Sequence, residues 1–178
     1  MKAEASALLL PRTIRMDSSD AQVFARAAEP GEWAVSGAFA FLESAPEMLR
    51  GKERQAFANG FLGTASFGWS SFVVVSEATE ADREALVRTL AAAFVAQWGA
   101  PSVEAAEPVA RDEVAFAESL CAGHPVNTLL AVSREWGEDG IREAFRTVRP
   151  PREGDHARIW SLEPEEGVDL VKLAGGRP

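Results

Sequence analysis

The chain is poor in the residues from which several common functional sites are built. Its 178 residues include one cysteine and two histidines, so no intramolecular disulfide can form. These three residues lack the spacing of a zinc site and are too few to close one. The phosphate-binding patterns G-x-G-x-x-G and G-x-x-x-x-G-K and the nucleophile elbow G-x-S-x-G are also missing. We therefore expect no metal and no cofactor, and whether the protein is an enzyme stays open because no catalytic residue can be assigned.

Long apolar segments and positive charge are scarce as well. The most apolar stretch, residues 86–98, is shorter than the roughly 20 residues that cross a bilayer, and it contains Arg88 and Gln97. The N-terminus lacks the apolar core of a secretory signal, so we expect a cytoplasmic protein with no membrane partner. A net charge of −9 opposes nucleic-acid binding, which relies on clustered Lys and Arg.

The remaining composition is that of a globular protein. Hydrophobic residues make up 47% of the chain and charged residues 25%, which is ordinary for a protein long enough to bury a core. There is no internal repeat and no low-complexity linker, so we predict one domain over residues 1–163. Residues 164–178 begin with acids and end in Gly-Gly-Arg-Pro. We interpret them as a tail that is mobile unless residues 170–173 dock on the domain.

Three segments in the first half of the chain have the alternation of β-strands. Residues 8–16 predict a first strand, and Pro11 suits a position at the edge of a sheet. After a Pro-Gly turn, residues 34–41 alternate bulky and small side chains and predict a second strand. Residues 66–76 hold three consecutive valines between aromatic residues, which favours a third strand.

Helical spacing predicts three helices, at residues 52–62, 79–98 and 109–122. The first helix has Phe57 and Phe61 four positions apart on one face. The second begins with Thr79 three residues before Asp82, which resembles a capping box. The third has Pro108 in its first turn, where the missing N–H would have had no partner.

The single cysteine lies at the end of the third predicted helix. Val114 and Cys121 share its apolar stripe, so we expect a buried thiol. Gly123 and Pro125 are typical of a helix C-terminus, and the helix dipole there disfavours a thiolate. A nucleophile or metal ligand formed by Cys121 and His124 is therefore disfavoured.

Residues 128–148 predict a β-hairpin around the turn GEDG. A register in which both strands follow directly from this turn sets Glu135 opposite Arg142 and Arg134 opposite Glu143. Opposite charges then face each other across the hairpin. The charge match supports this register.

The predicted elements indicate an α+β fold. A further strand at residues 156–162 follows the hairpin in this interpretation. Strands before and after the helices favour a two-layer sandwich, with a largely antiparallel sheet and helices on one face. A ferredoxin-like arrangement is one candidate.

Acidic residues concentrate in the segment that holds the second and third predicted helices. Between Ser76 and Glu118, nine Asp and Glu residues stand against three arginines. Two interpretations are open. The segment is either an acidic docking face for a basic protein partner or a pair of solvated helix surfaces, the second being the more common origin of such charge.

A different hypothesis places a small-molecule pocket between helix 52–60 and the sheet. Aromatic walls and polar groups would converge there, and the candidate ligand-binding residues are Trp33, Phe57, Asn59, Phe61 and Trp69. Near the end of the hairpin, Arg146 and Arg149 have no evident acidic partner, so they are the candidates for binding an anionic ligand. Packing is the structural alternative for the aromatic residues.

Four segments carry a resemblance to known sequences: EPGEWAVSGAFAF, GKERQAFANGFLG, ESLCAGHPVNTLLAV and IREAFRTVRP. With them the chain resembles a family of small uncharacterised alphaproteobacterial proteins over most of residues 8–150. The resemblance implies a cytoplasmic bacterial protein with no assigned activity and no catalytic residue to carry over. It further implies an accessory role, for example in the assembly of a redox enzyme.

Three functions are therefore considered from the sequence. The first is a non-enzymatic accessory or protein-binding module that uses the acidic helical face. The second is a small-molecule binding protein or enzyme with the aromatic pocket. The third is a homo-oligomer joined through a strand edge.

Overall fold

The computed structural model describes residues 7–16, 19–149 and 172–174, which contain two antiparallel sheets. The larger sheet has the order β1-β5-β6-β7-β8, formed by Leu9–Ile14, Phe72–Glu77, Leu129–Gly137, Gly140–Val148 and Lys172–Ala174. The smaller sheet has the order β2-β3-β4, formed by Ala34–Val35, Phe61–Gly63 and Trp69–Ser70.

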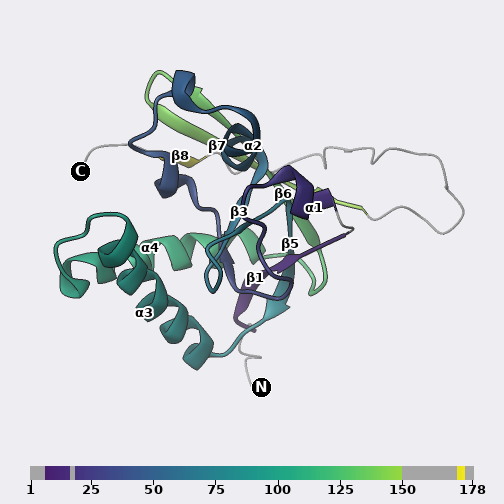
Figure 1. Ribbon diagram of the computed structural model, residues 1–178. Coiled ribbons are helices and arrows are strands. Elements are labelled where there is room, and N and C mark those ends of the chain that lie inside the picture. The colour runs from purple at the N-terminus through teal and green to yellow at the C-terminus, as the bar shows by residue number, and fades with distance from the viewer. Residues whose placement is uncertain (1–6, 17–18, 150–171, 175–178) are drawn as a thin grey trace, which may run out of the picture.

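The helices of the described residues lie in two places. They are α1 (Ser19–Val23), α2 (Gly51–Asn59), α3 (Glu80–Gln97) and α4 (Val103–Cys121), with two 3₁₀ turns, η1 (Ala38–Phe41) and η2 (Pro46–Met48). In Figure 1, α3 and α4 form a hairpin at one end of the molecule, whereas α2 lies beside β7 at the other end. Contacts join α4 to β1 and β2, and α2 to β6. The α+β class is thus confirmed, while the strand order does not establish the ferredoxin-like arrangement.

The core extends from the helical hairpin into the sheets. Its helical part is a buried row of mostly small side chains on α4 against larger ones on α3: Ala106, Ala110, Val114, Ala117, Leu86, Leu90 and Phe94. Small residues on one helix allow the two helix axes to approach closely. The expected burial of Cys121 is confirmed, since its side chain is inaccessible and packs with Val73, Leu130 and Val132 of the central strands.

Strand β1 lies at the end of the larger sheet and joins it to the smaller one. Its other edge pairs with the segment before β2, through the bridge between Arg12 and Trp33. The Thr13 N–H donates to the Glu32 carbonyl at 2.8 Å, and the Gly31 N–H donates to the Thr13 carbonyl at 2.8 Å. Pro11 occupies this strand, as the sequence predicted.

The predicted strand at residues 34–41 is wrong beyond Val35. Gly37 has a φ of 87°, which few residues other than glycine adopt, and η1 follows it. A Cβ at Gly37 would lie 2.7 Å from Leu62 Cβ and 2.8 Å from a ring carbon of Trp69. Close packing therefore requires a glycine here, and its left-handed backbone ends the strand.

The predicted helix at residues 52–62 is too long, because α2 ends at Asn59. Gly60 is extended and Phe61 begins β3. Phe57 and Phe61 consequently do not share a helical face. A Cβ at Gly60 would lie 2.7 Å from the Ala56 carbonyl oxygen, so the tight exit from the helix depends on glycine.

Two further boundaries differ from the sequence interpretation. The strand at residues 66–76 is divided into β4 and β5 at Ser71. Helix α4 begins at Val103, because Ser102 caps it by accepting a hydrogen bond from the Ala105 N–H at 3.1 Å. Pro108 therefore lies inside the helix and not in its first turn.

The capping box, the helix end and the hairpin are confirmed. Thr79 and Asp82 each accept a hydrogen bond from the other's backbone N–H, and Gly123 has a φ of 81°. The strands β6 and β7 pair in the predicted register, with Glu135 opposite Arg142 and Arg134 opposite Glu143.

Two predictions about the C-terminal part of the chain stay predictions. The strand at residues 156–162 lies outside the described residues, and the division into a domain of residues 1–163 and a tail stays a prediction. Residues 172–174 form β8, which pairs with Ile141–Glu143 of β7. None of the described helices is long and apolar enough to cross a membrane.

Candidate functional site

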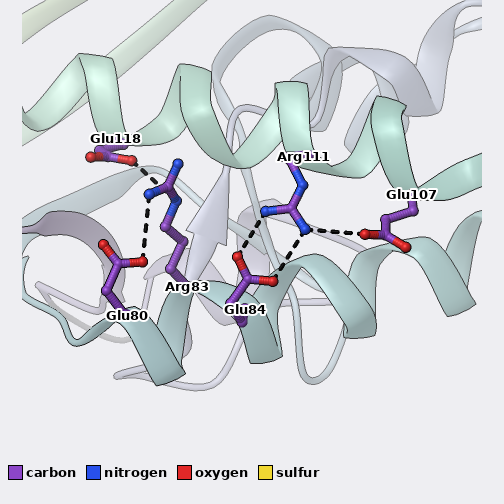
Figure 2. Close-up of polar contacts among 6 residues, drawn as sticks. All are labelled: Glu80, Arg83, Glu84, Glu107, Arg111 and Glu118. Carbon is purple, nitrogen blue, oxygen red and sulfur yellow. Dashed lines mark hydrogen bonds and ion pairs between the residues drawn. The ribbon is translucent and has the colours of Figure 1, made fainter.

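The acidic segment folds into the α3–α4 hairpin, where arginines join the two helices (Figure 2). Arg111 of α4 donates to Glu84 of α3 with both terminal guanidinium nitrogens, Nη1 and Nη2, at 2.7 and 3.1 Å. The same arginine donates to Glu107, one turn earlier on α4, at 3.1 Å. This two-nitrogen contact fixes the orientation of both side chains, because a guanidinium and a carboxylate match geometrically.

A second arginine repeats the arrangement one helical turn away, again with one acid from each helix. Arg83 of α3 lies 3.6 Å from the Glu80 carboxylate on its own helix and 3.5 Å from that of Glu118 on α4. We call these six residues the ladder: Glu80, Arg83, Glu84, Glu107, Arg111 and Glu118. The ladder has four carboxylates and two guanidinium groups, so it remains negatively charged.

The ladder lies at the surface of the protein. The exposed fractions of its side chains run from 29% for Arg83 to 75% for Glu80. Hydrogen bonding to Arg111 lowers the pKa of Glu84, and hydrogen bonds to Glu84 and Glu107 raise the pKa of Arg111. Glu84 and Arg111 are therefore charged at neutral pH, while water and salt still reach them.

The exposed surface around the ladder carries small and acidic residues together with a further base, Arg88, whose charge acts on Glu84. The outer surfaces of the two helices carry exposed side chains with little bulk: Ala81, Ala85, Ala92, Ala105, Pro108 and Ala115. Glu104 and Asp112 of α4 are exposed as well. The result is a shallow, negatively charged surface, which we call the ladder face.

Not every acid of the segment belongs to this face. Asp82 closes the α3 capping box, and its hydrogen bond with the Thr79 N–H lowers its pKa. Glu113 is half-buried, and its charge acts on Arg134 in the hairpin. The sequence shows how many acids the segment contains, but it does not show which of them lie on the same surface.

A second arginine–carboxylate pair lies in the interior and was predicted only as a cross-strand pair. The side chains of Arg134 and Glu143 are both fully buried, with Nε 3.1 Å from Oε2. Arg134 also donates to the carbonyls of Phe57 at 3.0 Å and Gly60 at 2.6 Å, at the end of α2, and to that of Ser36. Burial lowers the pKa of Arg134, although the charge of Glu143 opposes that change.

This buried pair connects four parts of the chain. The Ser36 hydroxyl donates to Glu143 at 3.3 Å, which closes the network around the carboxylate. The orphan carbonyls at the end of α2 obtain a charged donor in place of water. We interpret the pair as the structural link between β6, β7, α2 and the chain after β2.

Glu32 is a buried carboxylate with no arginine partner among the described residues. It accepts hydrogen bonds from the N–H groups of Ala65, Ser66 and Glu29 at 2.6–2.8 Å, and from the Ser66 hydroxyl at 2.6 Å. Burial favours the neutral acid, but these donors hold the pKa of Glu32 below its usual value. The carboxylate thereby fixes the loop between β3 and β4 against the turn before β2.

The structure does not bring the five predicted pocket residues together. Phe57 lines a cleft between α2 and β6, which we call the α2 cleft, with a volume of about 180 Å³. Trp33 lies instead in a separate hollow beside α3, under the Arg12 guanidinium at 3.9 Å from its ring centre. Phe61 is fully buried, and Trp69 packs against Phe41 with ring centres 5.1 Å apart.

Asn59 and the two predicted anion-binding arginines also lie apart from one another. Asn59 is the last residue of α2 and does not line the α2 cleft. Arg146 is half-buried on β7 opposite Ala131, and its Nε has no hydrogen-bond partner among the described residues. Arg149 is exposed just after β7. The role of the two arginines in binding an anion stays a prediction.

The Cys121 and His124 pair has the geometry of a helix end. Burial, and then the charge of Glu118, raise the pKa of the Cys121 thiol to about 12. The His124 N–H donates to the Cys121 carbonyl at 3.2 Å. In the part of the chain that the structure describes, no cluster of three or more His, Cys, Asp or Glu residues could hold a metal ion.

These features define an α+β protein with two antiparallel sheets and a charged helical hairpin. The chain belongs to a family of unknown function (DUF6505), whose pattern matches residues 8–161. The matched range includes the ladder, the buried pair and the α2 cleft. Comparisons with curated proteins and with solved structures found no match.

Proposed function

We propose that the protein is a non-enzymatic protein-binding module that uses the ladder face to bind a basic surface of another protein. The observation that carries this proposal is the ladder itself, in which two arginines hold four carboxylates in fixed positions at the surface. Ordered charges lose less side-chain entropy on binding than free ones do. The ladder can therefore present a defined charge pattern.

The small residues around the ladder support the same proposal. Alanines are exposed on the outer surfaces of both helices, and they add little bulk beside the carboxylates. A partner can approach the helix backbones closely, and its Lys or Arg side chains can reach the carboxylate oxygens that the ladder arginines leave open. Complementary charges of this kind raise association rates and specificity more than affinity.

An accessory role follows from this type of surface. A module that contributes a charged docking face and no catalytic group acts through the protein that it binds. Assembly of a redox enzyme is the specific form of this role that we propose.

The small-molecule alternative has less support. Ligand pockets usually enclose about 300 Å³ or more, whereas the α2 cleft by itself has about 180 Å³ and the larger hollow beside it is more open to solvent. Of the five residues predicted to line a pocket there, only Phe57 does so.

The proposal is tested with a tagged full-length chain used to isolate partners from an extract of the source cells. Retained proteins and small molecules are identified by mass spectrometry, and the partner is then purified for affinity measurements at several salt concentrations. Light scattering on the protein alone shows whether it self-associates. We expect one stoichiometric protein partner whose affinity falls as salt rises.

Two double variants with the same change of charge make the test specific. Glu80→Lys with Glu107→Lys alters the ladder, whereas Glu43→Lys with Glu138→Lys alters exposed acids elsewhere. The first variant should weaken partner binding by about tenfold or more, and the second should leave it unchanged. Equal losses in both variants, or a retained metabolite without a partner, would contradict the proposal.

A further inference from the structure

The end of the molecule opposite the ladder carries a second surface with different chemistry. Besides the α2 cleft, a more open hollow of about 450 Å³ lies beside the beginning of α2. Pro46, Leu49 and Arg54 line both, so the two depressions adjoin across η2 and α2. We call this combined surface the α2 groove. Figure 1 shows α2 beside β7, well away from the α3–α4 hairpin.

The α2 groove has an apolar floor. Phe57 and Trp136 stack with ring centres 4.8 Å apart and planes 10° from parallel, and both line the α2 cleft together with Leu49. In the chain just before α2, Met48 of η2 is 75% exposed, the largest such fraction among the described large hydrophobic residues, and Leu42 is 50% exposed. Exposed apolar surface gathered around a depression is typical of protein interaction sites.

Basic side chains lie along the rim of the groove, although the protein as a whole is acidic. Arg50, Lys52 and Arg54 are exposed within five consecutive positions. None of their side chains has a hydrogen bond or an ion pair with any described residue. Although Glu47 and Glu53 lie in the same segment, residues 46–54 hold three basic residues against these two acids, in a chain of net charge −9. Glu135 also lines the α2 cleft, where it is paired with Arg142 at 3.7 Å.

We propose that the α2 groove binds an acidic peptide segment of a partner protein that carries a bulky apolar side chain. The cleft volume suits one such side chain, which would pack on the Phe57 and Trp136 rings as a buried anchor. The acidic residues of the segment would pair with Arg50 and Arg54 at the rim. This surface is distinct from the ladder face, which selects the opposite charge.

The probe for this proposal is a phage-displayed library of random short peptides, selected on the full-length protein. We expect the enriched sequences to combine Asp or Glu with Leu, Phe, Met or Trp. Peptides synthesised from the selection should bind with an affinity that falls with salt, and they should perturb the indole resonance of Trp136, assigned with Trp136→Phe.

Two variants locate the binding site. Arg50→Glu with Arg54→Glu should weaken binding by about tenfold or more, and Ala58→Phe, which fills the cleft from α2, should weaken it independently. The matched control, Arg26→Glu with Arg88→Glu, makes the same charge change at exposed positions outside the groove. Circular dichroism checks that each variant is folded. The proposal is overturned if no peptide is enriched, if the enriched peptides are basic, or if the groove variants bind as well as the control.

Discussion

The two arginine–carboxylate systems of this protein use the same chemical groups in opposite environments. In the ladder, each arginine joins acids of α3 and α4 at the surface, with side chains 29–75% exposed. In the hairpin, Arg134 and Glu143 are completely buried and connect α2 to β6 and β7. Exposed pairs contribute little stability, whereas removing one partner of a buried pair leaves an uncompensated charge. Breaking the buried pair should therefore cost far more stability than breaking the ladder, and the ladder is free to serve binding.

The largest effect is expected from breaking the buried pair. Arg134→Leu leaves the Glu143 carboxylate without its cation and the carbonyls of Ser36, Phe57 and Gly60 without their donor. We expect the free energy of unfolding to fall by about 3–5 kcal/mol. Urea unfolding followed by tryptophan fluorescence measures the change, because Trp136 lies near the pair.

A double variant separates the charge from the carbonyl contacts. Arg134→Leu with Glu143→Leu removes both charges, so it should recover part of the loss. Recovery should be incomplete because the α2 carbonyls still lack a donor. A loss for Arg134→Leu no larger than that of a surface variant would contradict the contrast between the two systems.

An intermediate effect is expected at Glu32, a buried carboxylate held by neutral donors alone. Glu32→Gln replaces a charged acceptor of four hydrogen bonds by an amide, which should cost about 1.5–3 kcal/mol at pH 7. The folded-state pKa of Glu32 is lowered, so its contribution is complete above the unfolded value of 4.5 and is lost as the pH falls through the folded value.

Unfolding experiments at several pH values test this dependence. The difference between the wild type and Glu32→Gln should be constant at neutral pH and shrink with acidification below pH 4.5. A difference that grows on acidification would show that the carboxylate is destabilising when charged. The matched control is Glu43→Gln, which makes the same chemical change at an exposed position.

The smallest effect is expected in the ladder. Arg111→Ala should change the melting temperature by only about 2 °C or less, because water and salt already screen the groups that it contacts. Any difference from the wild type should disappear at high salt. A large, salt-independent loss of stability would show that the ladder holds the two helices together, and it would weaken its assignment as a binding face.

Local sequence patterns were sufficient where neighbouring residues decide the structure. The Thr79 and Asp82 capping box, the left-handed Gly123 and the register of β6 with β7 were all predicted correctly, since each depends on residues a few positions apart. The buried Cys121 also followed from helical spacing. The acidic character of the α3–α4 segment was visible in the composition alone.

Errors arose where distant parts of the chain meet. Gly37 ends its strand because Leu62 and Trp69 leave no room for a side chain, and Gly60 turns the chain out of α2 for a similar reason. The five candidate pocket residues stay a prediction. Packing places Trp33, Phe61 and Phe57 in three different clusters, and Trp69 packs against those of Trp33 and Phe57. These contacts join residues that are far apart in the chain, so residue spacing does not predict them.

The residues of the chain were enough to predict the α+β class, the capping box of α3, the glycine after α4, the charge match of Arg134 with Glu143 and the acidity of the α3–α4 segment. Only the tertiary structure decided that this matched pair is buried while the acids of the segment form an exposed ladder. The physical reason is that charge complementarity is a property of two residues, whereas burial depends on every element packed around them. Contacts between arginine and carboxylate groups thus connect buried elements at Arg134 and Glu143, whereas in the ladder they form part of the protein surface.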